Sequence, residues 1–102
     1  MDNKETIETA AAQYGRKIVN DTLTVCALDL ASASLLLNDA LTTKPEQTEH
    51  NECLRQSLVG RLADMLIAVD LICEYIDRKD VREAVRQRMI RLSVQINAAP
   101  LP

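Results

Sequence analysis

Residues 54–76 read LRQSLVGRLADMLIAVDLICEYI, and this stretch decides the fold class. Its apolar residues recur at every third or fourth position, which places them on one face of an α-helix. This face contains Leu54, Leu58, Leu62, Met65, Val69, Ile72 and Ile76. Leu66 and Cys73 widen it, so we expect a helix from Asn51 to Ile76 that is buried on more than one side. Gly60 costs about 1 kcal/mol relative to alanine inside a helix, and we expect close packing to compensate for it.

Two helices are predicted before this stretch. The first runs from Glu5 to Tyr14, and Gly15 ends it because glycine accepts a left-handed backbone at a helix terminus. The second runs from Asp21 to Leu41, with Asn20 or Asp21 as its N-cap. Its three consecutive leucines, 35–37, also indicate contacts with more than one neighbour.

A polar connector and a last helix complete the expected organisation. Residues 42–50 contain Pro45 and form the only clear linker of the sequence. The last helix runs from Val81 to Ile96, and we expect Asp80 to cap it. Its apolar stripe is Val81, Val85, Met89, Leu92 and Ile96, with four arginines at other positions.

The composition favours a single all-α domain spanning residues 1–102. The chain is 47% hydrophobic, has no Trp and no Phe, and contains only 2 Gly and 3 Pro, which leaves little material for β-hairpins. A net charge of -3 with this apolar content excludes a disordered chain. The same mild acidity argues against a nucleic-acid partner, so we expect the arginines of the last helix to be solvated.

No uninterrupted apolar run reaches the length of about 18 residues that a membrane span needs. The first residues, MDNKE, are polar and lack the apolar run of a signal peptide. We therefore expect a cytoplasmic protein with no membrane partner.

Cys26, Cys53 and Cys73 share no metal-binding spacing, and their number is odd. We expect buried, reduced thiols, while a disulfide or a thiol nucleophile stays an alternative. The single histidine, His50, lies in the polar connector, which gives little support to Cys–His catalysis.

The predicted helices carry more apolar surface than one small bundle can hide. A helix of about 25 residues buries one face in its own chain and can offer another to a partner. The sequence therefore predicts a homo-oligomer, either a dimer or a tetramer.

Four segments together resemble a known family. Residues 26–32 (CALDLAS) and 62–70 (LADMLIAVD) are similar to the two motif helices of short, phage-type MazG proteins, and 5–15 and 76–79 (IDRK) also resemble that family. The resemblance covers nearly the whole chain. It implies a four-helix bundle that assembles into an oligomer and removes pyrophosphate from nucleoside triphosphates with Mg²⁺.

The family's metal site rests on a Glu-x-x-Glu on one helix and a Glu-x-x-Asp on the next, because residues three apart share a helix face. The resemblance places Asp29 and Ser32 at the first motif, although Ser34 is an alternative to Ser32. It places Arg61 and Asp64 at the second. Four carboxylates would sum to -4, whereas Asp29, Ser32, Arg61 and Asp64 sum to -1. We therefore expect a degraded metal site in which Arg61 pairs with Asp29 or Asp64 in place of the metal.

Three functions are compatible with these observations. The first is a divergent pyrophosphohydrolase that uses Mg²⁺. The second is an inactive relative that binds a nucleotide through Arg61, with Arg16 and Lys17 near the triphosphate, or that binds a protein, for example to interfere with a host defence against phage. The third is a structural helical assembly in which Asp29, Asp64 and Arg61 are ordinary surface charges. We expect lost or reduced hydrolysis.

Overall fold

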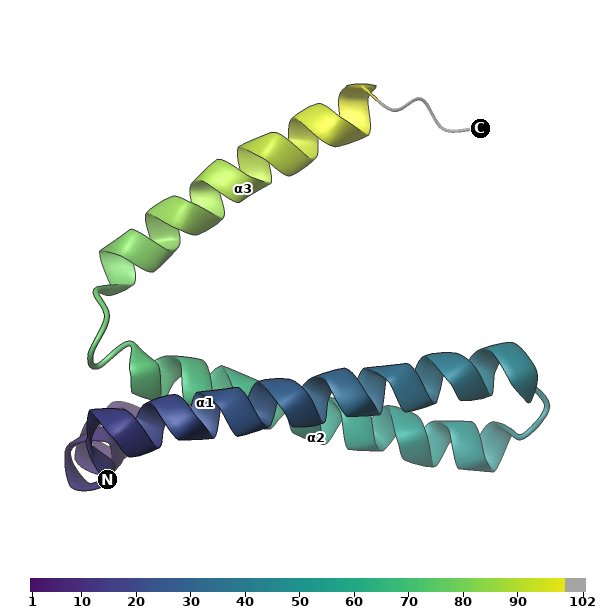
Figure 1. Cartoon of the computed structure of the whole chain (residues 1–102), viewed down its shortest axis with the longest axis horizontal. Coiled ribbons are helices and arrows are strands. Elements are labelled where there is room, and N and C mark those ends of the chain that lie inside the picture. The colour runs from purple at the N-terminus through teal and green to yellow at the C-terminus, as the bar shows by residue number, and fades with distance from the viewer. Residues whose placement is uncertain (99–102) are drawn as a thin grey trace.

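The computed structural model describes residues 1–98, and these form three α-helices with no strand. They are α1 (Asn3–Thr43), α2 (Thr48–Ile72) and α3 (Arg78–Ala98). Figure 1 shows α1 and α2 running side by side in opposite directions, while α3 leads away from them. The prediction of an all-α chain is confirmed.

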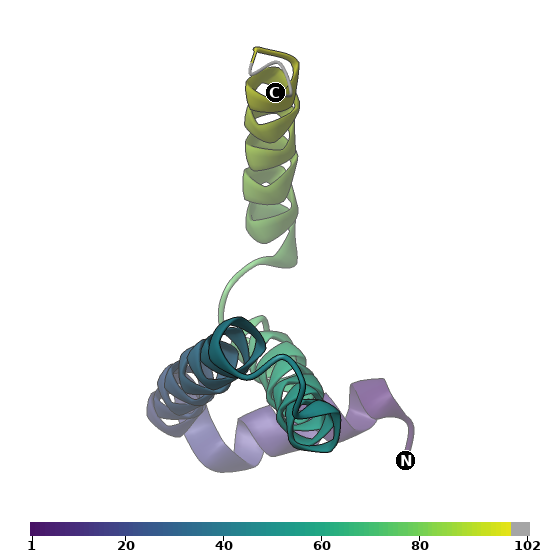
Figure 2. The ribbon, with the colours of Figure 1, turned by 90° about the vertical axis from the view of Figure 1, so that its right-hand side faces the viewer.

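A kink at Gly15 divides α1 into two arms. Asp2 caps the first arm, and its Oδ1 accepts a hydrogen bond from the Glu5 amide at 2.7 Å. Gly15 has φ 81° and ψ 162°, a backbone conformation that is essentially restricted to glycine. The predicted break is confirmed, but the helix resumes at once, so the expected cap at Asn20 or Asp21 is wrong. Figure 2 shows the first arm lying across the end of the hairpin formed by α2 and the second arm of α1.

The hairpin turn is shorter than the predicted connector, because α1 continues to Thr43 and α2 already begins at Thr48. Asn51 is buried in the first turn of α2. Its side-chain amide donates to the Lys44 carbonyl oxygen at 3.0 Å. This bond closes the turn across the chain reversal, and no regular helical bond could supply it.

The buried core is small and lies near the kink. Its buried members are Ala11, Val19, Leu71 and Ile72, with Ile7, Ala10 and Leu23 partly buried around them. Ala33, Ala40 and Ala68 are buried elsewhere on α1 and α2. Both arms of α1 contribute, so the kink is what folds the first arm onto the end of α2. Leu62 and Ile76 are exposed, which shows that α2 does not bury the whole apolar face predicted for it.

The segment between α2 and α3 is a second ordered turn that the sequence did not predict. α2 ends at Ile72 rather than Ile76, and Asp77 rather than Asp80 caps α3, because the Asp77 carboxylate accepts from the Lys79 amide at 2.9 Å. Tyr75 Oη donates to the Ala11 carbonyl oxygen at 2.6 Å. Ala11 lies in the last turn before the kink, where helix carbonyls run short of backbone donors. The bond therefore ties this turn to the first arm of α1.

Beyond its first residue, α3 contacts neither of the other helices, and none of its residues is buried. The radius of gyration is 17.6 Å, whereas a compact domain of this length has about 13 Å. The helices of one described chain therefore do not close the four-helix bundle that the family resemblance implies.

Two expectations about packing also change. The three cysteines are free, but Cys53 is exposed and Cys26 and Cys73 are only half-buried. A Cβ atom added to Gly60 would meet nothing within 4 Å. Close packing within the chain is therefore not the reason for a glycine at position 60.

Candidate functional site

Arg61 lies between two aspartates on the packed helices α1 and α2. Its Nη1 is 4.0 Å from Asp29 Oδ2 on α1 and 3.8 Å from Asp64 Oδ2 on its own helix. The expected pairing of Arg61 with Asp29 or Asp64 is present, and it involves both aspartates. The antiparallel packing of α1 on α2 brings Asp29 to residues that are distant from it in sequence.

A shallow depression adjoins this cluster. It is lined by Asp29, Ser32, Ala33, Leu36, Ser57 and Arg61. Ser32, and not Ser34, is the serine of α1 that lines it. Ser57 was missed by sequence reasoning, although it precedes Arg61 by four residues and so shares its helix face.

The charges in this cluster are solvated. Arg61, Asp29 and Asp64 each expose about half of their side chain, 47%, 50% and 55% in that order. Their separations exceed hydrogen-bond distance, and exposed ion pairs of this kind contribute about 0–1 kcal/mol each. The cluster therefore does not hold the two helices together to any large extent.

The residues of the cluster do not suit Mg²⁺. This ion prefers an octahedral set of oxygen ligands, usually with one or two carboxylates. Here a guanidinium group stands beside both carboxylates and leaves a net charge of -1. At about 4 Å from a divalent ion, its repulsion is roughly 8 kcal/mol for an effective dielectric constant near 20. Within residues 1–98, no group of three or more His, Cys, Asp or Glu side chains is arranged to hold a metal.

Arg16 and Lys17 lie at a different place on α1. Lys17 Nζ pairs with Asp21 at 2.9 Å, and both side chains are exposed. At a helical rise of about 1.5 Å per residue, Lys17 is roughly 18 Å along α1 from Asp29. The three basic residues considered for a nucleotide therefore do not converge on one site.

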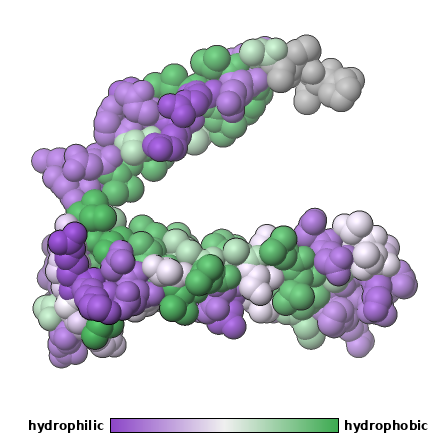
Figure 3. All heavy atoms as spheres, viewed as in Figure 1, coloured by the Kyte–Doolittle hydropathy of each residue, from purple (hydrophilic) through white to green (hydrophobic). Residues whose placement is uncertain are grey.

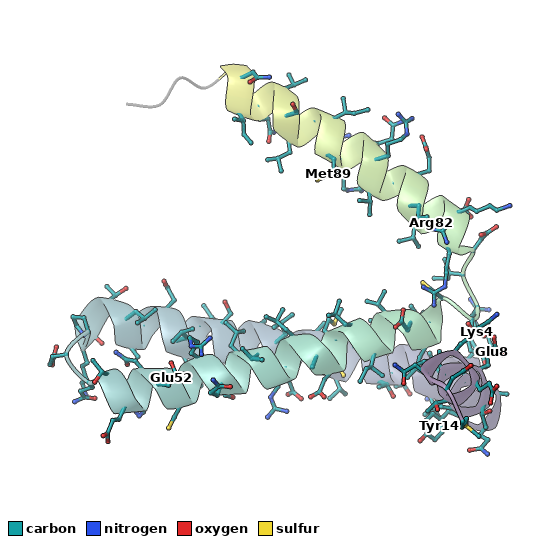
Figure 4. The ribbon with its side chains drawn as sticks, turned by 180° about the vertical axis from the view of Figure 1, so that it is seen from behind. Lys4, Glu8, Tyr14, Glu52, Arg82 and Met89 are labelled. Atoms are coloured by element: carbon teal, nitrogen blue, oxygen red, sulfur yellow. The ribbon has the colours of Figure 1, made fainter. Side chains whose placement is uncertain are left out.

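A second group of charges surrounds the start of α3. Arg78 pairs with Asp70 at 3.3 Å, and Lys4 approaches Glu8 at 3.9 Å, beside a depression that these four residues share with Glu74. Figure 4 shows Lys4 and Glu8 together close to the turn that precedes α3. Two cations and three carboxylates line the depression, so its net charge is -1, and Glu74 is the carboxylate without an ion pair among these residues.

One pattern, Glu-x-x-Arg-Gln, occurs on both α2 and α3. Glu52 accepts hydrogen bonds from Arg55 at 2.7 Å and from Gln56 at 3.0 Å. Glu83 accepts from Arg86 at 2.7 Å and from Gln87 at 2.9 Å. The hydrogen bond from Arg55, followed by that from Gln56, lowers the pKa of Glu52 to about 2, and the bond from Arg86 lowers the pKa of Glu83 in the same way.

The substitution Arg55→Gln should raise the pKa of Glu52 back toward 4.5, because it removes the strongest donor to the charged carboxylate. The native pair favours the folded chain above the ordinary pKa, and this contribution is lost as the pH falls from about 4.5 to about 2. A carboxyl ¹³C titration by NMR measures the shift. Arg86→Gln is the matched control and should leave the Glu52 titration unchanged. An unchanged Glu52 titration in Arg55→Gln would contradict the assignment.

α1 also contains an 18-residue window that is long and apolar enough to cross a membrane by length and composition alone. Only 11% of that window is buried. A single helix of this kind is weak evidence of a membrane span, and α1 packs against α2 along the hairpin (Figure 1).

Comparisons with family models, with curated proteins and with solved structures found no match to this chain. The MazG resemblance therefore remains a prediction that rests on the residues quoted for it.

Proposed function

We propose that this chain is a MazG-like helical protein that has lost, or strongly reduced, metal-dependent hydrolysis of nucleoside triphosphates and that works by binding. The observation that carries the proposal is the position of Arg61 beside both Asp29 and Asp64. A guanidinium group in that place supplies one positive charge to the carboxylates where the family resemblance would put Mg²⁺. The chain then needs no metal cofactor.

The proposal includes assembly into a homo-oligomer, a dimer or a tetramer, in which the four-helix bundle is completed. The accessible surface of the chain is 8046 Å², whereas a compact monomer of its mass exposes about 5,800 Å². Large apolar side chains are exposed on all three helices. Figure 3 shows them over both the hairpin and α3. An exposed apolar area of this extent supports a protein partner.

Pyrophosphate release tests the loss of hydrolysis. We expect none above background from a panel of nucleoside triphosphates with Mg²⁺ or Mn²⁺, and no difference between the native chain and Asp64→Ala. The reason is that no set of carboxylates is free to hold the metal that must activate water. Release that Asp64→Ala abolishes would show that a working site survives, and the proposal would then be wrong.

Thermal unfolding separates the two kinds of binding partner. A ligand that binds only the folded state raises the melting temperature by mass action. A rise with nucleotide that needs no metal would support a nucleotide-binding relative. Since both ion-pair partners of Arg61 are acidic, we expect no rise in the melting temperature with nucleotide. We therefore favour a protein partner in the cytoplasm. The first candidate is a second copy of the chain, and the second is a host protein of a phage-infected cell.

A further inference from the structure

The proposed assembly leaves open which surfaces meet. The most unusual feature of the fold is α3, because its 21 residues form a regular helix that does not pack on the other two helices of residues 1–98. An isolated helix of this length gains little stability in water without a packed apolar face. Its apolar stripe, Val81, Val85, Met89, Leu92 and Ile96, is exposed throughout.

The charge of the chain is divided between α3 and the remainder. α3 contains six basic residues and two acidic ones, a formal charge of +4. The whole chain has a net charge of -3, so the remainder has -7. At about 100° per residue, Arg82 and Arg88 border the apolar stripe of α3 on opposite sides. A surface that covers this stripe should therefore be apolar with acidic residues along it.

The second arm of α1 has such a surface. Ile18, Val25, Leu28 and Leu35 are exposed and follow one another at steps of seven, three and seven residues, which places them on one face. Asp21 and Asp39 lie on the same face and are exposed as well, so that the steps along it become three, four, three, seven and four. Asp21 is paired with Lys17 of the same arm, whereas Asp39 has no ion pair within the described residues. Apolar residues at alternating steps of three and four are the pattern of helices that pack along one another. α3 is about 31 Å long and this arm about 42 Å, so the whole of α3 can be accommodated.

The turn before α3 holds this helix away from its own hairpin. Tyr75 is hydrogen-bonded to Ala11 of the first arm, Arg78 is paired with Asp70, and the Asp77 carboxylate caps α3. The amides of residues 73–76 are also bonded to carbonyls in the last turn of α2. Because the turn is ordered at each of these points, α3 leaves in a set direction, and Figures 1 and 2 show it well separated from α1 and α2.

We propose that two copies of this chain exchange α3, so that the cationic, apolar face of α3 in one copy packs along the acidic, apolar face of α1 in the other. A two-fold axis makes both contacts equivalent. The excess of about 2,000 Å² per chain over a compact monomer gives a total near 4,000 Å² for two chains. That total lies within the range of about 2,000–5,000 Å² found for obligate homodimers. The inference rests on the assembly included in the proposed function and adds the element that each copy contributes.

Isotope-filtered NMR on the full-length chain tests the exchange directly. In a 1:1 mixture of ¹³C-labelled and unlabelled chains, the filtered experiment detects only contacts between copies. We expect contacts from the side chains of Val85, Met89 and Leu92 to those of Val25 and Leu28. Light scattering on the same sample should give twice the mass of one chain.

A matched pair of variants tests the face of α3. Met89→Glu places a charge in the stripe, and Gln87→Glu makes the same change of helix charge on the opposite side of α3 (Met89 is labelled in Figure 4). Because each substitution enters a two-fold dimer twice, Met89→Glu should weaken the dimer at least roughly 100-fold. Gln87→Glu should weaken it less than about tenfold.

The possible results distinguish the exchange of α3 between copies from the assembly of the chain into an oligomer. A native chain with the mass of a monomer at micromolar concentration overturns both. A dimer or tetramer without contacts between α3 of one copy and α1 of another overturns the exchange alone. Equal dissociation constants for Met89→Glu and Gln87→Glu also overturn it. If Met89→Glu fails to fold, the filtered contacts of the native chain still decide the question.

Discussion

The substitution Arg61→Glu should create a binding site for Mn²⁺ where the native chain has none. It removes the guanidinium group beside Asp29 and Asp64 and adds a third carboxylate, so the charge of the cluster changes from -1 to -3. It also creates a Glu-x-x-Asp spacing on one helix face, which lets two carboxylates approach the same ion. We expect the dissociation constant for Mn²⁺, measured by calorimetry, to fall at least tenfold relative to the native chain.

Arg91→Glu is the matched control for this experiment. It changes the net charge of the chain by the same amount, and Arg91 is exposed on α3. No acidic residue lies three or four positions from Arg91, so this variant creates no new pair of carboxylates on one helix face. Equal Mn²⁺ affinity in the two variants would show that the gain is only a general effect of negative charge. The interpretation of Arg61 as a substitute for the metal would then be wrong.

The chain's two glycines should respond to alanine with opposite signs. Gly15→Ala should lower the free energy of unfolding by about 1–3 kcal/mol, because its φ of 81° and ψ of 162° are strained for any residue with a Cβ atom. Gly60→Ala should raise it by about 0.5–1 kcal/mol, because Gly60 lies in the interior of a regular helix. Urea denaturation followed by circular dichroism measures both changes.

The comparison of Gly15→Ala with Gly60→Ala measures the effect of backbone conformation on stability, without a contribution from side-chain clashes. A Cβ atom at either glycine would meet nothing within 4 Å, so a steric clash contributes to neither result within one chain. Both variants should be compared with the native chain at the same protein concentration, because association changes the apparent stability. Destabilisation by both substitutions would contradict the account of Gly60. An effect near zero for Gly15→Ala would contradict the account of the kink.

The variant Gly60→Ala also tests whether Gly60 lies in a contact between two chains. If Gly60→Ala stabilises the monomer but weakens the dimer, then this glycine is retained for close approach of a second copy. Light scattering of this variant at several concentrations would show it. The original expectation of close packing at Gly60 would then apply between chains rather than within one.

Local features of this protein could be predicted because they depend on neighbours in the sequence. The step of three or four between apolar residues is sufficient for a helix, so the helical segments and the break at Gly15 follow from the sequence. The sequence does not determine which residue caps α3, since Asp77 and Asp80 are equally good acceptors three residues apart and only one can lie at the helix start. The predicted helix from Asn51 to Ile76 ends four residues too late, because apolar residues continue through the turn in which Tyr75 donates a hydrogen bond to Ala11.

The candidate site was predictable in its residues and not in its geometry. The spacing of Arg61 and Asp64 places them on one face of α2, whatever the rest of the chain does. Asp29 joins them only because the turn at residues 44–47 sets the register of α1 against α2. Arg16 and Lys17 are basic residues on the same helix as Asp29, yet the rise of that helix separates them from the cluster. No local pattern in the sequence shows that Asp29 joins the cluster whereas Arg16 and Lys17 do not.

The sequence by itself therefore determined that the chain is all-α, where its backbone breaks, and that Asp29, Ser32, Arg61 and Asp64 together supply one cation and only two carboxylates. Only the tertiary structure decided that Arg61 lies beside both aspartates and that α3 contacts neither of the other helices beyond its first residue. The physical reason is that helix periodicity is set by hydrogen bonds four residues apart, whereas packing depends on turns and side chains that bring distant segments together. The contact proposed between α3 and a second copy depends on two chains, and no periodicity within one chain specifies it.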